Sequence, residues 1–222
     1  MILHNEPSLS APQTKKKHFK KTKRFFDVFA SLVILIPLLP VMGLILLCVM
    51  RDGGPGLFGH QRIGRRGMPF TCLKFRTMRV DGDAVLAELL ATDTVARKEW
   101  NANRKLIHDP RVTPFGRLLR STSLDELPQL LNVLRGDMSL VGPRPVTQNE
   151  LDLYYEPDCA RLAYLSVRPG ITGPWQVGGR SELSYPKRVA LDHQYAEQQS
   201  LRTDMLILFR TINVVMRRTG AH

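Results

Sequence analysis

A stretch of twenty-three residues without a charged side chain, Val28–Met50, constrains this fold more than any other feature of the sequence. Leu, Ile and Val dominate it. A straight helix of this length reaches about 35 Å, enough for the roughly 30 Å hydrocarbon core of a bilayer. Such runs are typical of membrane segments rather than of buried soluble helices. A cleaved signal peptide fits poorly, because the apolar core is too long and no small-residue cleavage site follows it.

Both flanks of this segment are rich in basic residues. Residues 1–24 contain seven Lys or Arg and one acid, and arginines follow the segment closely: Arg51, Arg62, Arg65 and Arg66. Because cytoplasmic flanks carry an excess of Lys and Arg, both ends are predicted to lie on the cytoplasmic side. Pro37 and Pro40, near the middle, each remove a helical hydrogen bond and favour a kink. We therefore predict a re-entrant membrane helix over residues 25–51, with a straight crossing as the alternative.

The whole chain is strongly basic, with a formal net charge of +12 and an isoelectric point near 10.1, which calls for an anionic partner. We expect residues 1–24 to form a disordered basic arm. Beside a membrane segment each base is worth about 1 kcal/mol with anionic lipid, which favours a lipid tether over a solvated tail. The three cysteines exclude a disulfide framework and suit a reducing compartment.

Residues 52–222 are long enough for one well-buried domain, which we predict to be α/β, mostly helical with a small sheet. Leu57–Ile63 and Pro69–Met78 have the pattern of two hairpin strands, joined by a Gly-Arg-Arg-Gly turn. Five further segments have helical character: Asp83–Leu106, Phe115–Arg120, Leu127–Leu134, Tyr185–Gln198 and Asp204–Arg217. The last is a basic amphipathic helix, which fits a bilayer interface and the domain core about equally well.

Two adjacent acids, Asp125 and Glu126, stand in an otherwise basic region of this domain. One interpretation is structural, because Ser123 and Glu126 have the spacing of a capping box at a helix start. Pro128 weakens it, since a proline inside the helix would lose a hydrogen bond. Alternatively, Pro128 opens the helix and both acids lie in the turn that approaches it. The residues alone leave both interpretations open.

Cationic side chains accompany the acids and favour a phosphate site. Four residues are of the type that clamps phosphate: Lys74, Arg76, Arg120 and Arg144. A carboxylate beside such cations stays ionised and nucleophilic, and its neighbour could hold Mg²⁺, which prefers one or two carboxylates plus substrate phosphates. The sequence contains no Cys/His metal motif, no Walker-type glycine loop and no signature of a hydrolase triad.

Several motifs follow one another along the domain: Lys74–Met78, Asp109–Pro114, Leu119–Gln129, Asn132–Pro145 and Arg168–Gly173, followed by Trp-Gln-Val. In this order they closely resemble the bacterial sugar transferases, the small monotopic phosphoglycosyl transferases that start exopolysaccharide and glycan assembly. The resemblance runs from about Lys23 to the C-terminus. The chain has no extra transmembrane helices upstream, which is similar to the short, exopolysaccharide-production type.

The resemblance implies a covalent mechanism. A carboxylate attacks the β-phosphate of a UDP-sugar, UMP leaves, and polyprenyl phosphate then takes the sugar phosphate to give polyprenyl-diphosphate-sugar. The family's Asp-Glu dyad falls on Asp125, the nucleophile, and Glu126, the Mg²⁺ ligand. The family's arginines fall on Arg120 and Arg144, and its strand lysine on Lys74. The protein is then expected at the bacterial inner membrane, monotopic, with its catalytic domain on the cytoplasmic face.

The resemblance also bears on the donor sugar and on the membrane segment. Three residues are carried over as nucleotide-binding: Trp175, Gln176 and Arg180. The stretch from residue 99 to residue 110 resembles members that transfer hexose-1-phosphate, which indicates glucose or galactose. The family's re-entrant helix breaks at a Ser-Pro pair, and here Pro40 matches the proline while Leu39 replaces the serine.

The expected partners are a UDP-sugar, undecaprenyl phosphate and inner-membrane lipid, with a second copy of the chain as a candidate homodimer partner. A membrane-anchored nucleic-acid-binding protein is the main alternative. The aromatic content of 7% and the lack of a recognised binding module argue against nucleic acid. A catalytically inactive scaffold of polysaccharide assembly is the second alternative, for which Asp125 would be dispensable.

Overall fold

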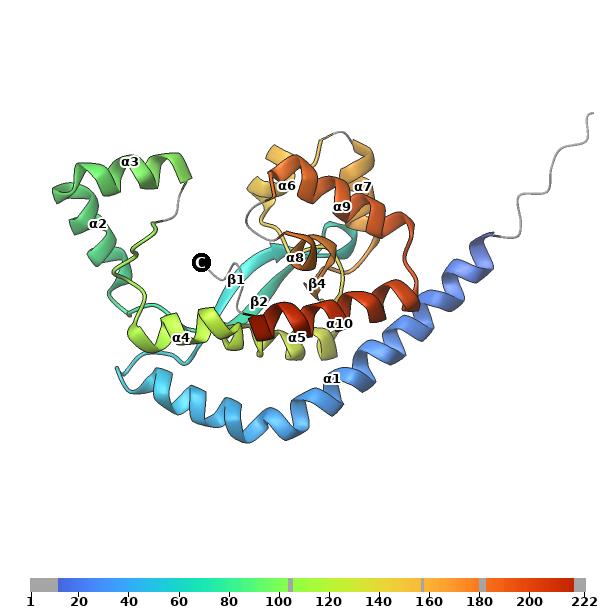
Figure 1. Ribbon diagram of the computed structural model, residues 1–222, viewed down its shortest axis with the longest axis horizontal. Helices are drawn as coiled ribbons and strands as arrows, with labels where there is room; N and C mark the ends of the chain where they lie inside the picture. The colour runs from blue at the N-terminus through green and yellow to red at the C-terminus, as the bar shows by residue number, and fades with distance from the viewer. Residues whose placement is uncertain (1–11, 104–105, 157, 180–182, 218–222) are drawn as a thin grey trace, which may run out of the picture.

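The structure of the protein, a computed structural model, describes residues 12–103, 106–156, 158–179 and 183–217. A long helix, α1 (Pro12–Met50), runs along one side of a body built from the rest of the chain (Figure 1). Residues 12–24 were expected to be disordered but belong to this helix, because extending an existing helix costs far less than starting one. The other residues of the expected arm, 1–11, lie outside the described residues.

The two prolines bend α1 without interrupting it. Pro37 and Pro40 lie inside the helix, and Figure 1 shows it curved with its concave side toward the body. The sequence predicts a helix–break–helix, whereas the structure shows one bent helix, since hydrogen bonding resumes beyond each missing amide. Over Phe19–Met50 this helix is long and apolar enough to cross a membrane, a property of its length and composition alone.

The two faces of α1 differ in exposure. One face is buried against the body through Ser31, Leu35, Ile45 and Val49. The other exposes large apolar side chains along the helix, from Phe25, 73% exposed, to Leu47, 66% exposed. A continuous apolar strip of this length is rare on a protein that meets only water, so this face is suited to lipid.

A β-hairpin follows α1, as predicted. Strands β1 (Leu57–Ile63) and β2 (Pro69–Phe75) pair antiparallel, with Leu57 opposite Phe75, and a short turn, η1 (Arg65–Gly67), joins them. The second strand ends at Phe75 rather than at Met78, because the chain leaves β1 there and Met78 pairs with Val112 instead.

Helices make up most of the body. They are α2 (Gly82–Thr92), α3 (Thr94–Asn103), α4 (Pro114–Thr122), α5 (Gln129–Arg135), α6 (Gln148–Tyr154), α7 (Asp158–Ser166), α8 (Pro174–Gly178), α9 (Tyr185–Glu197) and α10 (Leu201–Arg217), with a 3-10 turn η2 (Leu124–Glu126). The single helix predicted over 83–106 is two helices, since Asp93 leaves the helix and its carboxylate accepts the Val95 and Ala96 amides. The other predicted helices are confirmed, with ends shifted by a few residues.

A second pair of strands was not predicted. β3 (Ser139–Val141) and β4 (Gly170–Thr172) pair in parallel. β3 leads into a Gly-Pro-Arg-Pro segment, and β4 lies between Pro169 and Pro174. Three-residue strands are too short for an alternating pattern to be recognised. The prediction of a mostly helical α/β fold is confirmed, but the strands form two separate two-stranded sheets.

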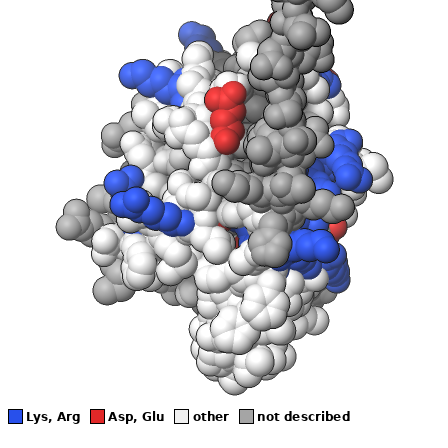
Figure 2. Space-filling model, turned by 90° about the vertical axis from the view of Figure 1, so that its right-hand side faces the viewer, with Lys and Arg blue, Asp and Glu red and all other residues white. Residues whose placement is uncertain are grey.

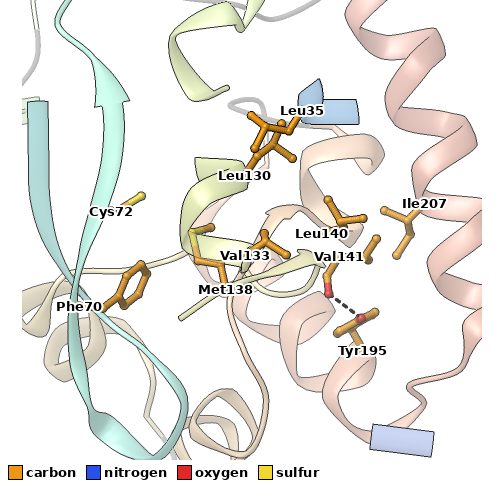
Figure 3. Packing of buried hydrophobic residues seen from close by; sticks show 10 residues of the cluster. All are labelled: Leu35, Phe70, Cys72, Leu130, Val133, Met138, Leu140, Val141, Tyr195 and Ile207. Atoms are coloured by element: carbon orange, nitrogen blue, oxygen red, sulfur yellow. Dashed lines mark hydrogen bonds between the residues drawn. The ribbon is translucent and has the colours of Figure 1, made fainter. Parts of the chain in front are cut away.

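The main apolar core lies where these parts meet. Figure 3 shows Leu35 of α1 beside Leu130 and Val133 of α5, with β3 and α10 on the far side. Val133 and Met138 are completely buried. The long apolar helix α1 is therefore packed into the same core as the strands and the C-terminal helix.

Polar contacts also join the start of α1 to the body. Lys23 Nζ lies 2.6 Å from Asp204 Oδ2 of α10 and donates to the Val141 carbonyl at 3.1 Å. Arg24 donates to the carbonyls of Val133 and Leu134. These two bases of the predicted lipid tether thus bind the protein itself.

Candidate active site

The two acids lie in a tight turn between α4 and α5, which we call the dyad turn (Ser123–Pro128). Ser123 has a positive φ of 57°, and η2 then carries the acids to Pro128, directly before α5. The Ser123 side chain makes no capping hydrogen bond. The capping-box interpretation was therefore wrong. The acids lie in the approach turn, because the left-handed residue reverses the chain before the helix begins.

The dyad turn packs against α1. Leu124 and Leu127, on either side of the acids, pack into an apolar cluster that contains Ile45 and Val49 of α1. Asp125 between them is only 7% exposed but faces the polar side of the turn, toward β2. The acids thus lie beside the part of the chain that is suited to lipid.

Lys74 of β2 stands between the two carboxylates. Its Nζ is 2.6 Å from Glu126 Oε1 and 3.6 Å from Asp125 Oδ2. The strand is held against α5 by the fully buried Asn132, whose side chain accepts the Leu73 amide at 2.9 Å and donates to the Thr71 carbonyl at 2.8 Å. Asn132 therefore places Lys74 against the dyad turn.

Arg120 is positioned from the other side of the turn. It lies in the last turn of α4, and its Nε donates to Thr77 Oγ1 at 2.9 Å. The start of α4 approaches the same threonine so closely that a Cβ at Gly116 would collide with the Thr77 carbonyl. Thr113 caps that helix start by accepting the Gly116 amide. Glycine is thus required for α4 to reach the depth at which Arg120 faces Asp125.

Arg144 comes from the loop after β3. Its Nη1 is 4.0 Å from Glu126 Oε1, and its guanidinium lies 5.8 Å from the ring centre of Trp175 in α8. The side chain is 43% exposed, so Arg144 can reach an incoming anion. Trp175, predicted to bind nucleotide, therefore lies at the edge of the same group of charges.

The two acids differ in their electrostatics. Burial raises the pKa of Asp125 above its ordinary value, and the Glu126 charge adds to the rise against Lys74 and Arg120. Burial also acts upward on Glu126, but Lys74 and Arg144 outweigh it, so the pKa of this carboxyl is lowered. The cations were expected to favour the ionised form of the nucleophile, but they lower the pKa of Glu126 and not that of Asp125, at which burial outweighs them. At Asp125 the anion is poorly solvated, which suits a nucleophile.

A small cavity, the dyad pocket, lies beside Lys74, Glu126 and Arg144. Sequence reasoning did not single out two polar residues that also line it, Arg62 and Gln129. Arg62 is on β1, and its Nη1 donates to Glu150 Oε2 at 2.8 Å. It could have been found from the hairpin register. Arg62 pairs with Phe70, and because side chains alternate along a strand, Arg62 and Lys74 lie on the same face of the hairpin.

Three of the predicted site residues lie apart from this group or outside the structure. Arg76 is fully engaged elsewhere, since it binds Asp52 and the carbonyls of Val49, Pro55 and Met78. It holds the end of α1 to the hairpin, so the structure does not bring it to the dyad. Gln176 lies in α8 beside Trp175. Arg180 is outside the described residues.

The acidic residues suit Mg²⁺ only together with a substrate. Within the described parts of the chain, no three His, Cys, Asp or Glu side chains are grouped as metal ligands. However, Asp125 and Glu126 both converge on the cationic Lys74 Nζ, which shows that the pair can share one positive charge. Two carboxylates completed by phosphate oxygens fit the preferences of Mg²⁺.

The sequence was also compared with known proteins. Residues 18–218 match the family described as bacterial sugar transferase. The chain belongs to this family. A bacterial sugar transferase from Salmonella typhimurium, undecaprenyl-phosphate galactose phosphotransferase, is 50% identical over 93% of this chain and 43% of its own length. Exopolysaccharide production protein ExoY of Rhizobium meliloti is 51% identical over 90% of this chain and 88% of its own length.

A third relative is more distant. Undecaprenyl-phosphate glucose phosphotransferase of Komagataeibacter xylinus is 41% identical over 86% of this chain and 35% of its own length. The chain thus spans less than half of the Salmonella and Komagataeibacter sugar transferases but most of the Rhizobium one. The family expected from the motifs is confirmed.

Proposed function

We propose that the protein transfers hexose-1-phosphate from a UDP-hexose to undecaprenyl phosphate with release of UMP, a first step of exopolysaccharide assembly. The observation that carries the proposal is the position of Asp125. It is a partly desolvated carboxylate beside Lys74 and Arg120, in a turn packed on α1. Arg144 lies by the neighbouring Glu126. Relatives whose names state galactose and glucose phosphotransfer to undecaprenyl phosphate support this choice of substrates.

The reaction proceeds in two displacements at phosphorus. An Asp125 oxygen attacks the phosphorus that carries the hexose, the bond to the UMP oxygen breaks, and an aspartyl phosphohexose forms. A phosphate oxygen of undecaprenyl phosphate then attacks the same phosphorus and releases Asp125, leaving undecaprenyl-diphosphate-hexose. A covalent intermediate lets a soluble donor and a lipid acceptor use the site in turn.

The surrounding cations stabilise the charge that develops on the phosphoryl oxygens. Lys74 and Arg144 face the dyad pocket, and Arg120 lies on the Asp125 side. Glu126, with its lowered pKa, would hold Mg²⁺ beside the diphosphate of the donor. A bound ion would offset the negative charge that develops on the UMP phosphate as it leaves. Trp175 is buried beneath the guanidinium groups of Arg144 and Arg188 and would help to position Arg144 at the edge of the site.

Replacement of the nucleophile tests the proposal. Asp125→Asn in the full chain is expected to lower UMP release from UDP-galactose or UDP-glucose with undecaprenyl phosphate by at least about a thousandfold, because no covalent intermediate can form. Intact mass measurement without acceptor should show a phosphohexose adduct on the natural chain and none on the variant. Asp152→Asn is the matched control, since Asp152 is an exposed aspartate paired with Arg161 outside the site. If the protein were instead an inactive scaffold or a nucleic-acid-binding protein, neither substitution would change its binding to its partner.

We further propose that α1 is re-entrant and enters the cytoplasmic leaflet of the inner membrane. Support comes from basic residues on both sides of the apolar stretch and from the bend at the two prolines. Lys21→Cys and Asp52→Cys are introduced separately into a chain whose own three cysteines are replaced. Both new thiols should react with an impermeant thiol reagent in inside-out membrane vesicles and not in right-side-out ones. Reaction of one site from each side would show a crossing helix instead.

A further inference from the structure

A second polar pocket lies at the other end of the parallel strands from the dyad. Both pockets contain residues next to β3 and β4. Arg144 and Ile171 line the dyad pocket, whereas Ser139 and Arg168 line the second one. The rest of the second pocket is lined by α1, η1, the end of α7 and the segment between α9 and α10, among them Lys20, Arg65, Ser166 and Gln199. We call this the basic pocket.

The acidic and basic side chains of the basic pocket do not balance. Asp27 accepts hydrogen bonds from Ser139 Oγ at 2.8 Å and from the Leu140 amide at 3.2 Å, and Lys23 is paired with Asp204. In the described parts of the chain, no carboxylate is recorded within salt-bridge distance of Lys20, Arg65 or Arg168.

The arginines of this pocket repel one another. Burial lowers the pKa of Arg168, and the charges of Arg65 and Arg24 lower it further, against the opposite effect of Asp27 and Asp137. Its Nε donates to the Gly136 carbonyl at 2.7 Å, which fixes the guanidinium next to those charges. A half-buried arginine held among other cations is a site that an anion would stabilise.

The place of the basic pocket along α1 indicates which kind of anion it meets. Lys20 and Asp27 are in the two turns directly before the uncharged stretch that begins at Val28. At this level the opposite face of α1 exposes the stacked rings of Phe25 and Phe29. Residues at this point of a membrane segment lie at the depth of lipid head groups. Figure 2 shows the side of the molecule where α1 begins, on which Lys and Arg far outnumber Asp and Glu.

We propose that the basic pocket binds the phosphate of an anionic membrane lipid, with Lys20, Arg65 and Arg168 as its ligands. The bound phosphodiester, which carries one negative charge, would offset part of the three positive charges and help to fix α1, through Asp27 and Ser139, at the amino end of β3. The site is separate from the dyad pocket and needs no nucleotide sugar, so the proposal does not depend on the chemistry at Asp125.

Two double variants with the same change in net charge test this. Lys20→Gln with Arg65→Gln removes two ligands. The control, Lys21→Gln with Arg66→Gln, removes the two exposed bases that directly follow these ligands in the sequence and do not line the pocket. The full chain, purified in neutral detergent, is titrated with phosphatidylglycerol, and bound lipid is counted by native mass spectrometry. We expect the dissociation constant to rise roughly fivefold for each ligand removed, about twenty-five-fold in all, and less than about twofold in the control.

The other outcomes would overturn the proposal. Equal weakening in both double variants would mean a diffuse basic surface rather than a pocket. Full displacement of the lipid by millimolar inorganic phosphate would mean that the pocket takes free phosphate. Thermal unfolding should not be lowered in any variant, because none of the four side chains forms an ion pair with a carboxylate in the described parts of the chain. Loss of the Arg65 charge also relieves its repulsion of Arg168. Arg65→Gln alone gives a further check, with an expected fivefold loss.

Discussion

At the scale of single residues, the two neighbouring acids of the dyad turn have opposite electrostatic roles. Asp125 is 10% exposed at its side chain and lies 3.6 Å from the lysine, whereas Glu126 is 24% exposed and lies at 2.6 Å. The closer contact lets the cation outweigh burial at Glu126 but not at Asp125. One residue is thus suited to hold positive charge and the other to attack.

This difference predicts stability changes of opposite sign at neutral pH. A raised pKa means that the folded chain binds the Asp125 proton more tightly than the unfolded chain, so the ionised form costs stability above the folded pKa. Asp125→Asn should therefore raise stability by about 1 kcal/mol at pH 7.5, a gain that disappears as the pH falls toward 4. Thermal unfolding at the two pH values measures it.

The neighbouring substitution should act in the other direction. Because the pKa of Glu126 is lower in the folded chain than in the unfolded chain, the ionised carboxylate stabilises the fold at pH values above the unfolded pKa. This stabilisation is lost as the pH falls through the folded pKa. Glu126→Gln should cost about 1–3 kcal/mol at pH 7.5, because it removes a charge-assisted hydrogen bond from Lys74. Equal melting temperatures for the two variants would contradict this account of the site.

At the scale of elements, one carboxylate connects three parts of the body. Glu150, in the first turn of α6, accepts hydrogen bonds from Arg62 of β1, Tyr185 of α9 and its own capping partner Thr147. Arg62 also lines the dyad pocket. The contacts of Glu150 therefore set the position of the Arg62 guanidinium beside that pocket. Glu150 is thus a positioning residue.

We expect Glu150→Gln to raise the KM for the UDP-sugar about tenfold while kcat changes less, since a charge-assisted bond worth about 1.5 kcal/mol no longer holds Arg62. Tyr185→Phe is the matched control, because it removes another hydrogen bond from the same carboxylate but keeps the Arg62 pair. Steady-state kinetics of UMP release distinguish the two. Similar KM values in both variants would show that Arg62 does not meet the substrate.

At the scale of the whole molecule, α1 is packed into the body of the protein rather than attached to it as a separate anchor. The buried pair Lys23–Asp204 joins its first turns to α10, and the Arg76–Asp52 pair holds its last turn to the hairpin. Between them, Leu35 and Ile45 enter two apolar clusters of the body. Movement of α1 would therefore move the dyad turn.

The Lys23–Asp204 pair gives a prediction at this scale. Lys23→Met should destabilise the protein by about 3–5 kcal/mol, because Asp204, completely buried, keeps its charge without a cationic partner. The double variant Lys23→Met with Asp204→Asn should recover most of this loss, since the amide still accepts the Tyr195 hydroxyl. Unfolding of the full chain in detergent measures both. An additive loss in the double variant would mean that the pair does not couple α1 to α10.

The sequence by itself determined the parts that depend on local pattern. The uncharged stretch, the hairpin and most helices follow from residue type and spacing, and the ordered motifs around Asp125 indicated the family. These features are readable because each depends on neighbours within a few residues. Even there, the chain direction at Ser123 could not be read, since a serine with positive φ is held by its surroundings.

Tertiary structure alone decided which charges meet. Lys74 on β2 and Arg76 just beyond its end are two residues apart and of similar chemistry, yet one faces the dyad and the other binds the chain at the end of α1. The short strands β3 and β4 and the residues Arg62 and Arg168 likewise gain their roles from partners distant in the chain. Contacts across such separations depend on how elements pack, and no local spacing records that.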